Sequence, residues 1–326
     1  MNDTPLLQVK DLYVQYMTDE DVVYAVNGLS AELYKGESLG FVGETGAGKT
    51  TTAFSIIQLL PKPAGVVTGG EIWFEGKNLL ENKEKDNVAI RGDGISMIFQ
   101  DPMTALNPTL RIGRQMMEVV ESHRKLPHKE AEAICIDMLE KVGIKRDRFN
   151  DYPHQLSGGM KQRVVIAMAL LCNPAVLIAD EPTTALDVTI QAQILEIIKR
   201  LIRESNMSMM LITHDLGIVA ETCDRIAVVY GGSVVESGTV QEVYANPAHP
   251  YTRGLFDSIP KLDDDSVELK PIEGEPPNPA RMPEGCAFHP RCRYCKDICR
   301  TEKPPVKGEN HQVRYHFAFE EVEVDG

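Results

Sequence analysis

The sequence has no hydrophobic run long enough to cross a membrane. Its longest uninterrupted apolar stretch, residues 164–172, has nine residues and is ended by Asn173 and Pro174, whereas a membrane-spanning helix needs about 18 or more. The first ten residues contain no apolar segment behind a basic start, so no secretory signal is expected. These features exclude a multi-span membrane protein and indicate a globular chain.

Basic residues are scarce as well. The 326 residues include 34 Lys and Arg against 48 Asp and Glu, which gives a net charge of −14. Because affinity for nucleic acid comes mainly from Lys and Arg contacts with phosphates, no nucleic-acid partner is expected. A nucleotide site is still allowed, because it relies on local backbone amides and one or two cations.

The composition changes late in the chain. Residues 259–326 contain nine of the 20 prolines and four of the seven cysteines. At about 150 residues per domain, the length predicts two domains. We expect the boundary near residues 258–260, with the acidic residues 263–265 in an exposed linker. The prediction is a first domain over 1–258 and a small C-terminal extension over 259–326.

A glycine-rich loop stands between a predicted strand, residues 38–42, and a predicted helix, residues 53–60. The loop fits the pattern G-x-x-x-x-G-K-[ST] with Gly43, Glu44, Thr45, Gly46, Ala47, Gly48, Lys49 and Thr50, followed by Thr51. Successive amides in such a loop and the positive end of the helix attract phosphate groups. We expect Lys49 to reach the outer phosphates and the Thr50 hydroxyl to ligate Mg²⁺.

Two carboxylates follow another apolar segment. Residues 175–179 predict a strand buried on both faces of a parallel sheet, and Asp180 and Glu181 come directly after it. Ligands of open α/β sheets lie beyond the carboxyl ends of the strands. We therefore expect Asp180 to hold Mg²⁺ and Glu181 to polarise the water that attacks the γ-phosphorus. His214 follows the apolar segment 209–213 and is expected to contact the γ-phosphate.

A serine and two glycines, Ser157, Gly158 and Gly159, precede a predicted helix over residues 164–171. This segment lies between the glycine loop and the acidic strand end. Three such motifs in this order make the sequence resemble the ATP-binding subunits of ABC transporters. Ser157 is a favourable N-cap, and the two glycine amides would face an anion. The resemblance implies an α/β P-loop NTPase fold with a parallel-sheet centre, an antiparallel N-terminal part and a helical subdomain over about 101–160.

The resemblance also implies roles for single residues. Gln100 is similar to the glutamine that senses Mg²⁺ and the attacking water, and Asp187 lies in the loop that crosses the dimer interface. Tyr16 is similar to the aromatic residue that stacks on adenine, with Tyr24 as the alternative. In this family the Ser-Gly-Gly segment of one chain closes over the nucleotide held by another, so ATP holds two subunits together and hydrolysis releases them.

Four cysteines lie within 14 residues of the extension, namely Cys286, Cys292, Cys295 and Cys299. In a chain without an export signal this favours a soft metal site over disulfides. The compact spacing suits a [4Fe–4S] cluster at least as well as zinc, which is the alternative. The other cysteines, Cys135, Cys172 and Cys223, lie in apolar patterns and are predicted to be core residues.

Further motifs indicate one branch of the family. Met160, residues 249–252 (His-Pro-Tyr-Thr), residues 274–277 (Gly-Glu-Pro-Pro) and the cysteines resemble dipeptide and oligopeptide importer ATPases. The resemblance implies ATP-driven peptide uptake at the cytoplasmic face of the cell membrane. Its implied partners are two permeases, a second related ATPase subunit and an external peptide-binding protein. Nickel or another solute is the alternative cargo, and a non-transport ABC ATPase with a redox-sensing tail is the alternative function.

Overall fold

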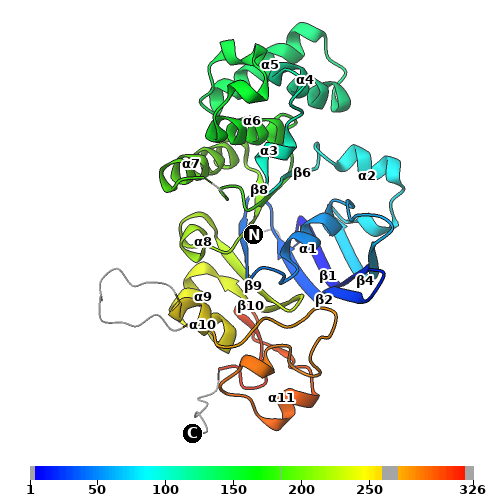
Figure 1. Cartoon of the computed structure of the whole chain (residues 1–326), viewed down its shortest axis with the longest axis vertical. Helices are drawn as coiled ribbons and strands as arrows, with labels where there is room; N and C mark the ends of the chain where they lie inside the picture. Colours follow the sequence, from blue (N-terminus) through cyan, green and yellow to red (C-terminus); the bar gives the residue numbers. More distant parts are fainter. Residues whose placement is uncertain (1–3, 185, 259–270, 320–326) are drawn as a thin grey trace. The chain divides into compact units, whose positions relative to one another are not determined.

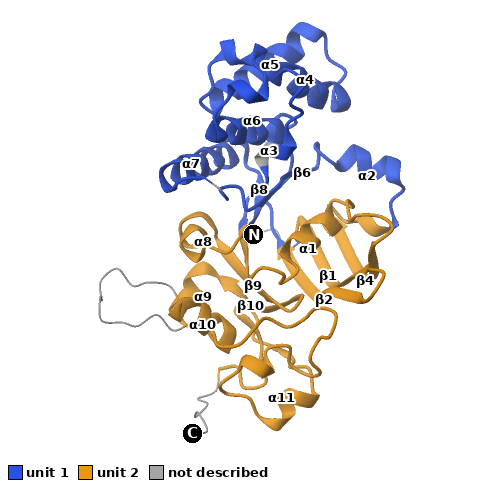
Figure 2. Cartoon of the chain, viewed as in Figure 1, with its two compact units in different colours: residues 1–4, 33–38, 81–212 blue, residues 5–32, 39–80, 213–326 orange. Residues whose placement is uncertain are grey.

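The computed structural model describes residues 4–184, 186–258 and 271–319. The chain divides into two compact units (Figure 2). Unit 1 contains Thr4 and residues 33–38 and 81–212, and unit 2 contains residues 5–32, 39–80 and the described part of 213–326. Among the helices of the described residues, none combines the length and the apolar character that a bilayer crossing requires.

Unit 1 is built on three parallel strands, β6 (Ile95–Ile98), β7 (Val176–Asp180) and β8 (Ser208–Thr213), with β7 in the middle. Every residue of the three strands is buried. Strands that are buried on both faces are typical of parallel sheets covered by helices. The strands predicted at 175–179 and 209–213 are confirmed to within one residue at each end.

The helices of unit 1 include the predicted helical subdomain. Its helices α4 and α5 pack on each other and on α6 (Figure 1), which confirms the helical character expected over about 101–160. The helices and 3-10 turns of this part are α2 (Glu84–Ile90), α3 (Pro102–Ala105), α4 (Ile112–His123), α5 (His128–Lys141), η2 (Arg146–Asn150), η3 (Pro153–Gln155), α6 (Gly158–Leu170) and α7 (Val188–Ser205), with η1 (Leu79–Glu81) before them.

Unit 2 contains the expected antiparallel sheet, whose strand order is β2-β1-β4-β5. Along β1 the buried side chains are mostly apolar, and a register shift after Lys10 interrupts their alternation. These strands are β1 (Leu7–Met17), β2 (Val22–Leu33), β4 (Gly65–Phe74) and β5 (Lys77–Asn78).

A second set of strands in unit 2 carries the glycine-rich loop. β3 (Ser38–Val42) is entirely buried and pairs in parallel with β9 (Arg225–Tyr230), and β10 (Ser233–Thr239) continues antiparallel to β9. The strand predicted at 38–42 is thus confirmed. The helices of this unit are α1 (Lys49–Ile56), α8 (Leu216–Thr222), α9 (Val240–Ala245), α10 (Pro250–Asp257), η4 (His289–Arg291) and α11 (Asp297–Thr301).

The C-terminal extension joins the rest of unit 2 by strand pairing. β12 (Gln312–Arg314) pairs antiparallel with β10, and β11 (Val306–Lys307) pairs with β12. A small core forms beside this pairing from Ala248, Val313, Tyr315 and Ala318. Residues 259–270 lie outside the described part, so the boundary near 258–260 and the linker at 263–265 remain predictions.

A buried carboxylate reinforces this junction. Glu236 of β10 is fully buried and accepts hydrogen bonds from the amides of Ala248 and His249 at 2.7 and 2.9 Å. Its carboxylate also lies 2.7 Å from Nε2 of His311. Burial by itself raises the pKa of Glu236, but the hydrogen bonds from His311 and the two amides lower it overall. The carboxylate therefore stays ionised at neutral pH although it is enclosed.

Candidate nucleotide site

The glycine-rich loop of unit 2 connects β3 to α1. Gly48 is the N-cap of α1 and has a φ of 98°, in the left-handed region that favours glycine. A Cβ atom at Gly48 would lie 2.4 Å from the carbonyl oxygen of Ala25, so no larger residue fits without a shift. The helix begins at Lys49, four residues before the predicted start at Ala53, because the loop itself leads into the first helical turn.

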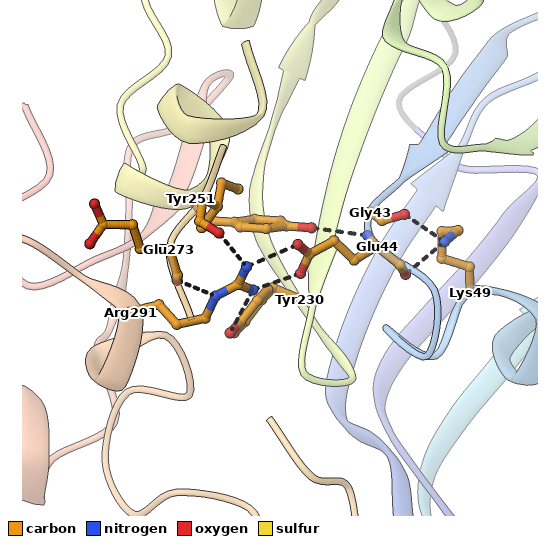
Figure 3. A network of polar contacts seen from close by, with 8 residues as sticks. Gly43, Glu44, Lys49, Tyr230, Tyr251, Glu273 and Arg291 are labelled. Atoms are coloured by element: carbon orange, nitrogen blue, oxygen red, sulfur yellow. Dashed lines mark hydrogen bonds and ion pairs between the residues drawn. The ribbon is translucent and has the colours of Figure 1, made fainter. Parts of the chain in front are cut away.

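Lys49 is folded back over the loop. Its side chain is buried, and Nζ donates hydrogen bonds to the carbonyl oxygens of Gly43 at 2.7 Å and Glu44 at 3.0 Å (Figure 3). The ammonium group is therefore held at the loop, beside the start of α1. A cation and a helix N-terminus at one place are the two features that the sequence analysis expects of a phosphate site here.

The two candidate adenine-stacking tyrosines lie in different surroundings. The hydroxyl of Tyr16 donates to Oγ1 of Thr51, in the first turn of α1, at 3.3 Å. The backbone amide of Tyr24 donates to the carbonyl oxygen of Pro279 in the extension at 2.8 Å. The Tyr24 residue also lines a cavity of about 290 Å³ together with loop residues 44–47 and extension residues 276–279.

The acidic strand end of unit 1 has the expected arrangement. Asp180 is the last residue of β7 and is 2% exposed. Glu181 follows with a φ of 45°, an uncommon value for a residue with a side chain, and its amide donates to the Ile212 carbonyl at 2.9 Å. This turn directs the Glu181 carboxylate toward Gln100, whose Nε2 donates to Oε2 of Glu181 at 2.9 Å.

The structure thus brings Gln100 and Glu181 together although they are 81 positions apart. Gln100 follows β6 and Glu181 follows β7, so the convergence results from two neighbouring parallel strands that end at one edge. Thr184 also contacts the carboxylate, with its hydroxyl 2.9 Å from Oε2 of Glu181. Thr184 could not be singled out from the sequence, because a threonine three residues after a catalytic candidate carries no distinctive signal.

The Ser-Gly-Gly segment forms the exposed start of α6. Ser157 is the N-cap, and its side chain accepts a hydrogen bond from the amide of Met160 at 3.3 Å. Gly158 and Gly159 are the first two helical residues, which extends the helix six residues before the predicted start. Further along α6, Nε2 of Gln162 donates to the carbonyl of Pro182 at 2.6 Å, a link to the turn after Glu181 that the motif did not reveal.

Two further predicted residues begin helices or lie just before them. Asp187 is the N-cap of α7, and its carboxylate accepts from the amide of Ile190 at 2.9 Å. Ala185, two residues before it, lies outside the described residues. His214 is exposed and follows β8 in the chain, while the next residue, Asp215, caps α8. Unit 2 therefore carries His214, the phosphate loop and Tyr16, and unit 1 carries the other predicted nucleotide-site residues.

The four cysteines of the extension lie near one another. The amide of Cys286 donates to the carbonyl of Cys299 at 2.9 Å, and that of Cys295 to the carbonyl of Cys292 at 3.1 Å. Burial raises the pKa of the Cys292 thiol to about 12, and the other three thiols add to this effect. Within the described ranges, however, no three or more His, Cys, Asp or Glu side chains are arranged to hold a metal ion.

The other cysteines behave as predicted. Cys135, Cys172 and Cys223 are buried, and none of the seven cysteines forms a disulfide. Cys135 is enclosed among helices of unit 1, where burial raises its pKa to about 12. These three thiols are core residues.

Comparison with known proteins agrees with this geometry. The profile of the ABC transporter family matches residues 26–184, and that of the oligopeptide/dipeptide transporter C-terminal region matches residues 235–299. The chain is 49% identical over 312 residues to the dipeptide transport ATP-binding protein DppD of Bacillus subtilis, covering 94% of this chain and 93% of the relative. It is 47% identical over 320 residues to the oligopeptide transport ATP-binding protein OppD of Escherichia coli, covering 98% and 94%.

Solved structures define the class of fold. The dimeric post-hydrolysis ATP-binding cassette MJ0796 bound to ADP and Pi matches with a TM-score of 0.64 and 27% identity, over 72% of this chain and 98% of that one. The structure of cbiO1 from Clostridium perfringens matches with a TM-score of 0.64 and 28% identity, over 75% and 92%. The fold is that of an ABC-type P-loop ATPase.

The chain belongs to the ABC transporter family, within the branch of ATP-binding subunits that carry the oligopeptide/dipeptide transporter C-terminal region. ATP binding and hydrolysis coupled to transport is accordingly its activity.

Proposed function

We propose that this chain hydrolyses ATP to power the uptake of dipeptides and oligopeptides through a membrane ABC importer. The observation that carries the proposal is 47% to 50% identity, over 94% to 98% of the chain, to proteins named for dipeptide or oligopeptide transport. The match of residues 235–299 to the oligopeptide/dipeptide transporter profile supports it further, because this region lies outside the ATPase profile.

In this proposal the phosphates of ATP bind at residues 43–51. The loop amides and the Lys49 ammonium compensate the negative charge of the β- and γ-phosphates. Tyr16 stacks on the adenine, and its contact with Thr51 at the start of α1 favours it over Tyr24. Mg²⁺ neutralises phosphate charge when it is bound, and the oxygen donors of Thr50, Gln100 and Asp180 suit this hard cation.

The attacking water is oriented by residues at the carboxyl ends of the strands. Glu181 accepts a hydrogen bond from this water and polarises it, and Gln100 fixes the carboxylate through its 2.9 Å hydrogen bond. His214 contacts the γ-phosphate. Phosphoryl transfer needs little covalent help from a protein, so placement and charge compensation by these groups supply the catalysis.

A second ATPase subunit completes each site. The exposed start of α6, with Ser157, Gly158 and Gly159, offers amides at a helix N-terminus to the γ-phosphate held by the neighbouring chain. Asp187 lies in the segment that crosses between the chains. The neighbour is a second copy or a related ATPase. The assembly contains two membrane permeases and an external peptide-binding protein, and the ATPases lie on the cytoplasmic face of the membrane.

Deletion of the gene for this chain is expected to abolish uptake of labelled dipeptides by cells, and restoring the intact gene is expected to restore it. Uptake of labelled nickel, measured in the same strains, serves as the control for cargo. Unchanged dipeptide uptake together with lost nickel uptake would contradict the proposed cargo and support the alternative.

We further propose that the four cysteines of the extension hold a [4Fe–4S] cluster. An all-thiol donor set suits iron–sulfur clusters. Burial raises the pKa values of Cys286 and Cys292, and neighbouring thiols of the set raise them further. When bound, the cluster supplies a redox-active or structural centre in the extension. The four cysteines lie in one short segment of the extension. Cys286 and Cys299 are buried, and the other two are partly exposed.

Protein purified without oxygen is expected to be brown and to contain about four iron and four sulfide per chain. Cys292→Ser should lose this iron. Cys223→Ser removes a buried thiol of unit 2 outside the loop, so it should keep the iron. Stoichiometric zinc without iron would contradict the cluster and indicate a zinc site instead. Absence of both metals would reject a metal centre.

A further inference from the structure

The second residue of the phosphate loop, Glu44, is held by three different partners (Figure 3). Its amide donates to the Tyr251 hydroxyl at 3.0 Å, and its carbonyl accepts from Nζ of Lys49 at 3.0 Å. Its carboxylate receives two hydrogen bonds from Arg291, Nη1 to Oε2 at 2.7 Å and Nη2 to Oε1 at 3.1 Å. The backbone and the side chain of Glu44 are therefore both fixed.

Arg291 belongs to the cysteine loop of the extension, 247 positions away from Glu44 in the sequence. Its side chain is only 4% exposed, compared with 27% for Glu44. A buried, two-fold Arg–carboxylate pair fixes the relative orientation of its partners as well as their distance, because the guanidinium is planar and rigid. This pair is thus unlike an exposed ion pair, which contributes little.

The remaining donors of Arg291 anchor it within the extension. Nε donates to the carbonyl of Glu273 at 3.0 Å, and Nη2 also donates to that of Ile272 at 3.3 Å. The guanidinium lies 5.8 Å from the centre of the Tyr230 ring, and this ring packs at 4.5 Å against Tyr251. Groups other than Glu44 therefore also hold Arg291 in place.

The partners of Glu44 connect this position to the phosphate-binding cation. Lys49 uses the carbonyl of the same residue whose carboxylate Arg291 holds, so displacement of Glu44 displaces an acceptor of Lys49. Tyr251 restrains the same residue from α10. Arg291 and Tyr251 thus hold the phosphate loop from outside, on the side of Glu44 opposite to Lys49 (Figure 3).

We propose that Arg291 is a positioning residue of the nucleotide site: through Glu44 it keeps the phosphate loop in the conformation that binds ATP. The proposal rests on the assignment of residues 43–51 as the phosphate site. It gives the C-terminal extension a direct part in nucleotide affinity, in addition to any metal that it holds. If the contact between Arg291 and Glu44 is lost, a smaller fraction of the molecules has the loop conformation that binds ATP. The apparent affinity for ATP then falls in proportion to this fraction.

The test uses the full-length chain and a non-hydrolysable ATP analogue with Mg²⁺, titrated by calorimetry. We expect Arg291→Gln to weaken binding about tenfold, which corresponds to a loop that is competent about a tenth of the time. Hydrogen exchange of the amides of residues 43–49 should become faster in the absence of nucleotide. Arg291→Lys keeps the charge but cannot form the bidentate pair with the carboxylate, so it should cause an intermediate loss of affinity for the ATP analogue.

Two controls separate positioning from a general loss of structure. Arg293→Gln removes an exposed arginine two residues away and should leave the affinity unchanged. Glu44→Gln tests the same pair from the loop side. Arg291→Gln and Glu44→Gln remove the same interaction. The double variant should therefore bind the ATP analogue no more than about twofold more weakly than either single variant.

Wild-type affinity in Arg291→Gln or in Glu44→Gln would overturn the proposal, as would losses that multiply in the double variant. This outcome can be distinguished from a failure of the phosphate-site assignment, because that assignment itself predicts that Lys49→Ala abolishes hydrolysis. Lost activity in Lys49→Ala together with unchanged affinity in Arg291→Gln would reject the positioning role alone.

Discussion

Replacement of Lys49 by alanine is expected to abolish ATP hydrolysis in the assembled transporter. The ammonium group is the cation fixed by the phosphate loop, where it is buried and held by the carbonyls of Gly43 and Glu44. Negative charge on the transferred phosphoryl group needs compensation in the transition state, and removal of one such group costs about 10²- to 10³-fold in rate. The measurement is phosphate release with saturating ATP.

Two controls make this result specific. Lys77→Ala removes an exposed lysine of the antiparallel sheet and should leave turnover unchanged. Lys49→Arg keeps a positive charge but should remain strongly impaired, because a planar guanidinium does not replace a compact ammonium between two carbonyls. Near-normal turnover of Lys49→Ala, with the thermal unfolding midpoint unchanged, would reject the proposed phosphate site.

The phosphate loop and the acidic strand end could be predicted because their signals are local. The strands at 38–42 and 175–179 are short, mostly apolar runs, and each is followed at once by residues proposed for the nucleotide site. Gln100 was expected only from the resemblance, and its contact with Glu181 is explained by the structure, in which two neighbouring parallel strands end at one edge. Helix starts were less predictable, since α1 and α6 begin within glycine-rich segments that apolar patterning does not mark.

The contacts between the extension and the rest of unit 2 could not be predicted, because they join residues that are distant in the sequence. Nothing in the neighbourhood of Glu44 indicates a partner 247 positions away. Likewise, Glu236 is a charged residue in a strand, and only the fold shows that it is buried against Ala248, His249 and His311. The cysteine spacing predicts a metal site, but it does not indicate that an arginine of the same loop contacts the phosphate loop.

Asp187 has a local role in the structure and a separate, expected role at a dimer interface. The resemblance places it in a segment between two subunits, and in the chain by itself it is the N-cap of α7. An aspartate at this position satisfies an amide of the first helical turn whether or not a second subunit is present. The capping bond therefore explains the residue type by itself, and the interface role needs the assembled pair for its test.

Replacement of Glu181 by glutamine is expected to lower ATP hydrolysis by at least about a hundredfold while ATP still binds. Glutamine has almost the same shape, and its side-chain oxygen can still accept hydrogen bonds from Gln100 and Thr184, as the carboxylate does. It has no charge with which to polarise the attacking water. The loss of a negative charge near the γ-phosphate should also prolong the ATP-bound state.

Since ATP joins two subunits in the proposed mechanism, Glu181→Gln should form an ATP-dependent dimer that gel filtration resolves from the monomer. Glu196→Gln, an exposed change on α7, should hydrolyse ATP normally and accumulate no such dimer. A homodimer would appear with this chain alone, and a heterodimer only after addition of the second ATPase of the transporter. If Glu181→Gln binds ATP and stays monomeric even with that partner, then the nucleotide is not shared between two chains, and Ser157, Gly158 and Gly159 have no γ-phosphate to contact.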